Sequence, residues 1–214
     1  MVSKRVDGRG RTKRPETRRE ELIDAALHLL THTQLDDLRV TDVTEAAGAA
    51  KGTFYLYFPA KDDLLTALRE EFAERFLRHL DQAVTRSASA GWNARIRALI
   101  EHAVDYSMRN QRAHEVLFHA EGSARERRRH DITAELAIVR WLAALFEAGA
   151  REGAFAVDDA EMVALLLYSA FHGGLDRAVH GGIYDRDRLI DGLEALFQRA
   201  LGPTPAPRRK RQPT

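Results

Sequence analysis

Four side chains that can bind a nucleic acid lie close together on one short predicted helix. Lys51 provides a cation, Thr53 a hydroxyl, and Tyr55 and Tyr57 two phenols, which can hydrogen-bond to base edges or phosphates. Gly52 lies among them and has no side chain, so the helix can approach a phosphate backbone closely. This combination on one outward face suits a helix that reads DNA in the major groove.

The flanking sequence predicts how this helix is positioned. A helical run covers residues 40–47, Gly48 follows where a helix can end in the left-handed conformation, and the second run covers residues 50–57. Pro59 closes the unit, because the residue before a proline is disfavoured in a helix. A longer helix over residues 15–32 carries apolar residues at helical spacing and is expected to support the pair. The sequence therefore predicts a helix-turn-helix head.

Three further residues are predicted to bind the DNA backbone. Arg39 and Thr41 start the first helix of the pair and would hold the other side of the groove, and Lys61 lies at the far end of the unit. Two alternatives stay open: Tyr55 could serve only for packing, and Lys61 could be an ordinary surface charge.

Positive charge is concentrated at the two ends of the chain. Residues 1–19 hold eight Lys/Arg and two Asp/Glu, residues 203–214 hold four Lys/Arg and no acid, and residues 20–202 hold 21 Lys/Arg and 30 Asp/Glu. Because an acidic body does not bind nucleic acid generally, DNA binding requires a local element and a basic arm. Residues 1–14 are predicted to be a disordered arm that lies along DNA or only keeps the protein soluble.

Helical patterns also fill the rest of the chain. They cover residues 61–85, 93–108, 112–120, 123–150, 159–180 and 187–201. The SASAG segment at residues 87–91 predicts a loop, and Gly149 and Gly153 are predicted to end the longest helix. No segment has a strand pattern, so we predict an all-α protein of about nine helices.

The composition narrows the class of protein. With 44% hydrophobic residues and 30% charged residues, the 214-residue chain is expected to be globular. It contains no cysteine, which excludes disulfides and thiolate metal sites. No long apolar run and no signal-peptide pattern occur, which predicts a cytoplasmic protein that does not contact a membrane.

Aromatic and imidazole side chains recur along the later helices and suit a pocket for a small, largely apolar effector. The candidates are His102, Tyr106, Phe118, Trp141, Phe146, Tyr168 and His172. The alternative is that these rings belong to the core.

The segment MVALLLYSAF, residues 162–171, is apolar on nearly every side and too short to cross a bilayer. A second copy of the chain is the simplest partner for its outer face, which predicts an isologous dimer through the last two helices. An internal core helix is the alternative. The predicted interface residues are Leu166, Phe171, Gly174, Leu189, Leu193, Leu196 and Phe197.

Two other classes of protein are alternatives, an enzyme and a metal-responsive regulator. An enzyme could use His114 with His119, or His102 with Tyr106, but no catalytic or cofactor-binding motif is present, so we predict no catalytic residues and no cofactor. A metal-responsive regulator would need a site of histidines and carboxylates, and no metal ligands are predicted here.

Residues 16–65, and above all the segment VTDVTEAAGAAKGTFYLYFPAKDDLL, resemble the DNA-binding head of the TetR (tetracycline repressor) family. The matching residues are Val40, Asp42, Val43, Ala46, Ala47, Gly48, Lys51, Gly52, Thr53, Tyr55, Phe58, Lys61 and Leu64. The resemblance implies a homodimer with an N-terminal three-helix reader and a C-terminal domain that binds a small effector and dimerises. It also implies a repressor that leaves its DNA when the effector binds, with an activator as the alternative.

Four residues depart from the usual pattern of that family. Gln34 replaces a glycine, Arg39 and Ala50 replace helix-capping hydroxyl residues, and Thr44 replaces an alanine where two helices cross. The fold prediction is unaffected, but the operator sequence cannot be transferred from a relative.

These observations predict four parts of the chain. They are a disordered basic arm (residues 1–14), a helix-turn-helix DNA-binding domain (residues 15–60), an effector-binding and dimerisation domain (residues 61–202) and a disordered basic tail (residues 203–214). A dimer would place two reading helices in successive major grooves, so we expect the operator to be an inverted repeat in double-stranded DNA.

Overall fold

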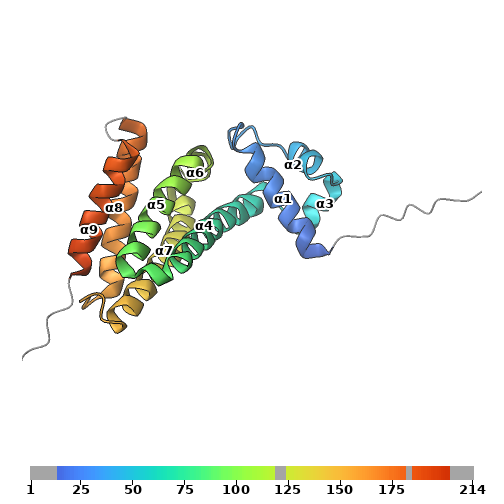
Figure 1. Ribbon diagram of the computed structural model, residues 1–214. Helices are drawn as coiled ribbons and strands as arrows, with labels where there is room; N and C mark the ends of the chain where they lie inside the picture. Colours follow the sequence, from blue (N-terminus) through green and yellow to red (C-terminus); the bar gives the residue numbers. More distant parts are fainter. Residues whose placement is uncertain (1–13, 119–123, 182–184, 203–214) are drawn as a thin grey trace, which may run out of the picture. The chain divides into compact units, whose positions relative to one another are not determined.

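The computed structural model describes residues 14–118, 124–181 and 185–202 (Figure 1). These ranges contain nine α-helices and one 3₁₀ helix and no strand, which confirms the predicted all-α fold. Residues 1–13 of the predicted arm, the tail at residues 203–214, and His119 lie outside the described residues. The chain divides into two compact units, and the first ends at Leu68.

Three helices build most of the first unit, which we call the head. They are α1 (Pro15–Leu29), α2 (Val40–Ala46) and α3 (Lys51–Tyr57). Pro15 occupies the first turn of α1, as predicted, where its missing N–H breaks no helical hydrogen bond. Gly48 has a φ of 59°, which confirms that a left-handed residue ends the α2 segment.

A small apolar core holds the head together. Its buried side chains are Leu22, Ile23, Ala26, Leu30, Leu38, Val43, Phe54, Phe58, Leu64, Ala67 and Leu68. Phe54 of α3 is fully buried, and its ring centroid lies 5.5 Å from that of Phe58. Burying such a side chain contributes about 1.5–3 kcal/mol, so these two rings fix α3 on the head.

The departures from the family pattern have visible local consequences. Neither Arg39 before α2 nor Ala50 before α3 makes a side-chain capping hydrogen bond, which costs about 1 kcal/mol per helix. Thr44 is 3% exposed, and its hydroxyl donates to the carbonyls of Val40 and Thr41 at 3.0 Å each. The extra hydroxyl is therefore satisfied within α2, and the crossing of the two helices tolerates it.

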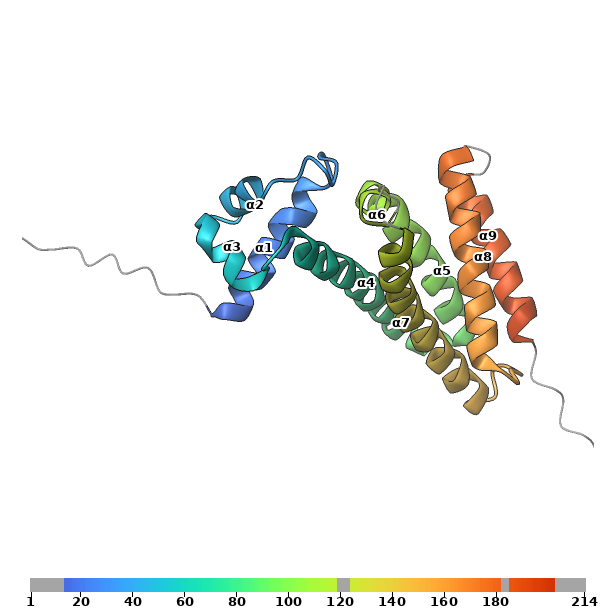
Figure 2. The same ribbon diagram turned by 180° about the vertical axis from the view of Figure 1, so that it is seen from behind.

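The remaining helices are longer. They are α4 (Lys61–Arg86), α5 (Trp92–Arg109), α6 (Gln111–Phe118), α7 (Ala124–Arg151), α8 (Ala160–Gly181) and α9 (Arg186–Leu201). The boundary between the units falls within α4, and the second unit, which we call the body, begins at Arg69. Helix α8 packs against α7 and α9, and α9 also packs against α5. Figures 1 and 2 show α8 and α9 side by side from opposite directions.

The structure adds detail to one predicted loop and corrects one predicted helix end. The SASAG loop contains a short 3₁₀ helix (Ala88–Ala90). Gly149 does not end α7, which continues to Arg151. A side chain at Gly149 would collide with the ring of Phe155, so close packing explains this glycine, whereas Gly153, with a φ of 77°, follows the helix as predicted.

One bidentate ion pair joins α5 to α9. The Arg186 guanidinium donates to the two carboxylate oxygens of Asp105 at 2.6 and 2.9 Å. This hydrogen bonding lowers the pKa of the Asp105 carboxyl. The pair therefore fixes the start of α9 against the body.

No helix in the described ranges is both long enough and apolar enough to cross a membrane.

Candidate functional site

Helix α3 presents most of the residues predicted to bind DNA. Lys51, Gly52 and Tyr55 are exposed, with Tyr55 at 49%, whereas Thr53 and Tyr57 are half-buried. The Tyr55 ring packs edge-on against Phe54, at 5.4 Å between centroids, so the buried ring supports the exposed one. The helix thus carries a cation and a phenol one turn apart on its outer face.

The two predicted residues before and within α2 are also exposed. The Arg39 side chain forms no cap, and the Thr41 hydroxyl donates only to the neighbouring Asp42 carboxylate, at 3.3 Å. Both side chains can therefore reach a ligand without breaking a buried contact.

Lys61 has a partner inside the head. Its ammonium donates to the carbonyl oxygens of Leu35 and Asp36, at 2.6 and 3.4 Å. The nearby Asp63 carboxylate accepts from the backbone N–H of Ala60 at 2.8 Å. Lys61 therefore ties the start of α4 to the segment after α1, instead of extending from the surface as a free charge.

Leu56 is a surface residue that is not among the predicted DNA-binding residues. Its side chain is 80% exposed on α3, between Tyr55 and Tyr57. An apolar side chain at a DNA-reading position can contact a thymine methyl group. The one signal in the sequence is its place on the second turn of the helix predicted to read DNA.

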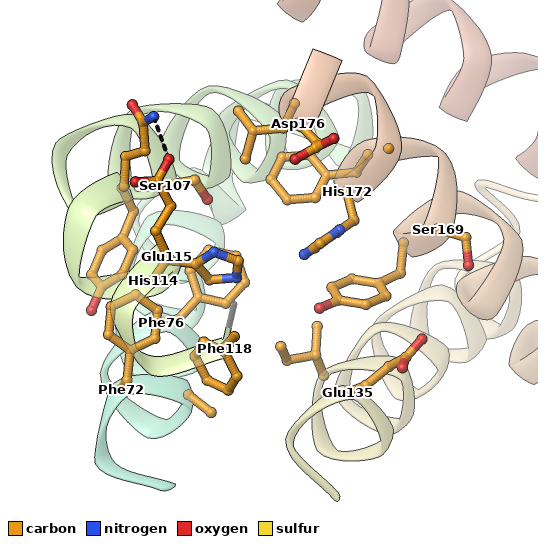
Figure 3. Close-up of a pocket in the computed structure, with 18 residues that line it drawn as sticks. Phe72, Phe76, Ser107, His114, Glu115, Phe118, Glu135, Ser169, His172 and Asp176 are labelled. Atoms are coloured by element: carbon orange, nitrogen blue, oxygen red, sulfur yellow. Dashed lines mark hydrogen bonds between the residues drawn. The ribbon is translucent and has the colours of Figure 1, made fainter. Parts of the chain in front are cut away.

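The body contains a cavity of about 460 Å³, and five helices contribute to its wall. Figure 3 shows His114 and Phe118 of α6 facing His172 of α8 across an open space. The lining residues are Phe72, Ala73, Phe76, Tyr106, Ser107, Gln111, His114, Glu115, Phe118, Glu135, Ile138, Tyr168, Ser169, Phe171, His172, Gly173, Leu175 and Asp176. The volume falls in the range of small-molecule sites.

Aromatic rings form a continuous cluster along this wall. The Phe72 ring lies 5.8 Å from Phe118 and 6.0 Å from Tyr106, and the His114 ring lies 5.0 Å from Phe118, between centroids. His114 also lies 5.5 Å from His172 on the opposite wall. The cavity is therefore narrow between α6 and α8.

Polar side chains alternate with the aromatic rings around the cavity. Burial raises the pKa of the Tyr106 phenol, so its hydroxyl stays neutral at ordinary pH. Glu115 accepts a hydrogen bond from the side-chain amide of Gln111 at 3.0 Å. Such a site can enclose an apolar molecule and orient it through a small number of polar contacts.

Two family models together cover most of the chain. Residues 22–68 match the model of bacterial regulatory proteins of the tetR family, and residues 89–174 match the tetracyclin repressor-like C-terminal domain. The chain belongs to the TetR family. It is a DNA-binding transcriptional regulator of that family, whose members are regulators and not enzymes.

Similar proteins agree with this assignment. Over 64 residues the chain is 41% identical to the uncharacterized HTH-type transcriptional regulator YvdT of Bacillus subtilis, covering 29% of this chain and 31% of the relative. Over 70 residues it is 31% identical to the fatty acid metabolism regulator protein of Bacillus subtilis, covering 33% and 36%. The chain thus matches only about a third of these two relatives.

A solved structure extends the likeness to the whole fold. The fatty acid degradation regulator FadR of Bacillus halodurans aligns with a TM-score of 0.65 and 21% identity, covering 87% of this chain and 96% of that one. At this identity, the likeness shows the fold alone.

Four of the predicted effector residues of this TetR-family chain line the cavity: Tyr106, Phe118, Tyr168 and His172. The other three do not. His102 Nδ1 lies 3.1 Å from His79 Nε2, Trp141 Nε1 donates to Asp81 at 3.4 Å, and Phe146 is fully buried with its ring 6.3 Å from Phe197. Phe146 is a core residue because its face of α7 packs inward.

Several residues that line the cavity were not predicted from the sequence. Phe72 and Phe76 belong to the apolar stripe of α4, and nothing local separates a stripe that packs from one that borders a cavity. Glu115, Glu135 and Asp176 come from three different helices, so only their tertiary arrangement brings them together. His114 lines the cavity too, although the sequence suggests for it only a possible enzyme site with His119.

The predicted dimer residues fall into two groups. Leu166 and Leu196 are 61% and 39% exposed, whereas Phe171, Leu193 and Phe197 are buried within the single chain, so little of their surface is left for a partner. Leu189 and Gly174 are half-buried and face each other, since a side chain added at Gly174 would lie 3.6 Å from Leu189. Met162 and Leu165, at 50% and 36%, extend the exposed apolar face of α8.

Among the described residues, no group of three or more histidines and carboxylates could hold a metal ion.

Proposed function

We propose that this protein is a transcriptional repressor that binds an inverted-repeat operator as a homodimer and leaves it when a small, largely apolar effector enters the cavity. The observation that carries the proposal is the aromatic-lined cavity of about 460 Å³ in a chain that also has a DNA-binding head. A regulator that only bound DNA would not need such a cavity in its body.

The head would read DNA through α3. Lys51 and Tyr55 would reach base edges or nearby phosphates. Gly52 faces open space, since a Cβ there would meet no atom within 4 Å, and the missing side chain would let the helix approach the DNA backbone. Thr53 and Tyr57 would add hydrogen bonds, and Arg39 and Thr41 would bind phosphates beside α2. Lys61 would act mainly by fixing the start of α4.

The dimer would form through α8 and α9. Met162, Leu165 and Leu166 lie at positions i, i+3 and i+4 and so share one exposed face of α8, and Leu196 is exposed on α9. An apolar face of this kind favours burial against an identical copy.

Helix α4 would link the effector to the DNA. Phe72 and Phe76 of α4 line the cavity, and Lys61 and Asp63 fix its first turn within the head. The Arg69 guanidinium, only 7% exposed, donates to the carbonyl of Leu117 at 2.8 Å and so joins α4 to α6. An effector that favours one position of α6 would thereby shift α4 through its differential affinity for two states.

The proposal is tested by selecting bound sequences from random double-stranded DNA with the purified full-length protein. We expect a motif with two-fold symmetry whose half-sites lie about one helical turn apart. A motif without an inverted repeat would overturn the dimeric reading mode. Failure to enrich any sequence would overturn sequence-specific binding.

The direction of regulation is tested with a reporter gene that carries the selected operator. Expression should rise when the gene for this protein is deleted and return to its repressed level when the gene is restored. A fall in expression on deletion would identify an activator instead.

A further inference from the structure

We propose that Leu56 selects a thymine in each half-site of the operator by packing against its 5-methyl group. This inference rests on the proposed function, because it takes α3 as the helix that reads DNA in the major groove. It adds a base preference that the polar side chains of α3 do not decide, and it gives a role to the leucine on the exposed face of that helix.

Leu56 points away from the core of the head. The buried ring of Phe54 lies two residues earlier in α3. At about 3.6 residues per turn, two residues turn the helix by about 200°, so the two side chains leave nearly opposite sides of its axis. Their burial agrees, because Phe54 is fully buried and Leu56 is 80% exposed. Leu56 therefore lies at the middle of the outward face of α3.

Gly52 leaves open space beside Leu56. The two residues are four positions apart and share one side of the helix. A helical side chain leans toward the turn that precedes it, so Leu56 extends toward Gly52. A Cβ added at Gly52 would meet no atom within 4 Å. No side chain therefore covers Leu56 from that direction.

Polar side chains lie on both sides of Leu56. Lys51 and Tyr55 are exposed and four residues apart on one side, and Thr53 and Tyr57 are half-buried and four residues apart on the other. When a helix lies in the major groove, the middle of its outward face meets the base edges and its flanks face the phosphates. Leu56 is therefore placed to reach the floor of the groove.

The chemistry of that floor offers one apolar partner. All base pairs present hydrogen-bond donors and acceptors in the major groove, and thymine also presents a methyl group. A leucine placed over a donor or acceptor would remove it from water without replacing its hydrogen bond, which costs free energy. A leucine placed against the methyl group buries two apolar surfaces, which is favourable. Leu56 should therefore favour thymine over the other three bases at the position it faces.

The test removes only this methyl group from the DNA. In the operator recovered by selection, each thymine is replaced in turn by deoxyuridine in both half-sites, which keeps every hydrogen-bonding group of the base pair. Gel shifts measure binding of the full-length protein to each operator. We expect one position at which the replacement weakens binding by about three- to fivefold per half-site, the effect of one buried methyl group.

Three variants assign this loss to Leu56. Leu56→Ala should bind the thymine and deoxyuridine operators equally, because it removes the side chain that contacts the methyl group. Leu56→Met keeps an apolar side chain of similar volume and should retain most of the difference. Leu136→Ala makes the same truncation at a 40% exposed position of α7 in the body and should retain the full difference of the parent.

The outcomes separate this inference from the proposed function. If the parent binds every deoxyuridine operator as tightly as the thymine operator, α3 still binds DNA but no methyl group is read. If Leu56→Ala weakens binding and keeps the full difference, Leu56 contacts a deoxyribose and the base preference is wrong. A selected half-site without thymine would also overturn it. If selection enriches no sequence, the proposed function itself fails.

Discussion

The head and the cavity differ in how far apart in the sequence their functional residues lie. Five of the residues proposed to read DNA fall within the seven-residue helix α3, where one buried ring, Phe54, fixes the outer face. The cavity takes its lining from five helices between Phe72 and Asp176. A site on one helix follows from local periodicity, whereas a cavity depends on how several helices pack.

The largest expected effect comes from a substitution that disrupts the core of the head and leaves the body folded. Phe54→Ala should destabilise the head by about 3–5 kcal/mol, because it deletes a fully buried ring. Hydrogen exchange should then rise in α1–α3 and stay low in α8 and α9, and operator binding should be lost. Leu56→Ala, at an 80% exposed position of the same helix, is the control and should leave exchange unchanged. Equal loss of protection in α8 and α9 would show that the units do not unfold separately.

Operator binding by the head should require a second copy of the chain. Leu166→Glu places a charge on the exposed apolar face of α8 and should weaken self-association about 100-fold, or about 2.7 kcal/mol. Sedimentation velocity should then show a monomer with unchanged helix content and weak operator binding. Met108→Glu is the matched control, since Met108 is 43% exposed on α5. A variant at Leu166 that stays dimeric would contradict the proposed interface.

If α3 reads DNA, two smaller changes on its exposed face should weaken operator binding and leave the body intact. Lys51→Ala and Tyr55→Ala should each weaken operator binding by about 1–3 kcal/mol. If Lys51 binds a phosphate, Lys51→Ala should also lower the slope of the binding constant against salt concentration by about one counterion. Gel shifts at several salt concentrations measure both quantities. Parent-like affinity in both variants would show that α3 does not read DNA.

Gly52 allows stability and binding to be separated within α3. Gly52→Ala should stabilise the head by about 0.5–1 kcal/mol, because alanine favours a helix and its Cβ would meet no atom within 4 Å. The same methyl group should hinder close approach to DNA and weaken operator binding. Urea unfolding and gel shift on one preparation test this pair of effects. A variant that is stabilised and binds as well as the parent would show that Gly52 does not lie against the backbone.

The smallest effect concerns the body at low pH. Burial and the neighbouring His102 lower the pKa of His79 below its ordinary value of 6.5. The unfolded chain therefore takes up this proton first, so the contribution of His79 is intact above pH 6.5 and declines as the pH falls below it. His79→Gln should flatten the decline in melting temperature below that pH. An unchanged slope would show that His79 does not titrate differently on folding.

The sequence predicted the all-α fold because apolar residues recur at helical spacing from one end of the body to the other. It predicted the left-handed turn at Gly48, which a glycine adopts without steric cost. It failed at Gly149, where the glycine accommodates the ring of Phe155, because a contact with a residue outside the helix leaves no periodic signal. The hydrogen bond of Lys61 could not be predicted for the same reason, because the carbonyl of Leu35 that accepts it lies 26 residues away in the chain.

The chain order and residue types alone are enough to specify the helices and the exposed face of α3, because helical periodicity and turn residues act within a few positions. Only the packing between distant helices determined which side chains line the cavity and which lie in the core. Helix packing places Tyr168 in the wall of the cavity and Phe146 in the core, although both are aromatic residues on apolar helices. It also brought Glu115, Glu135 and Asp176 around one space, because side chains from different helices become neighbours only when those helices pack.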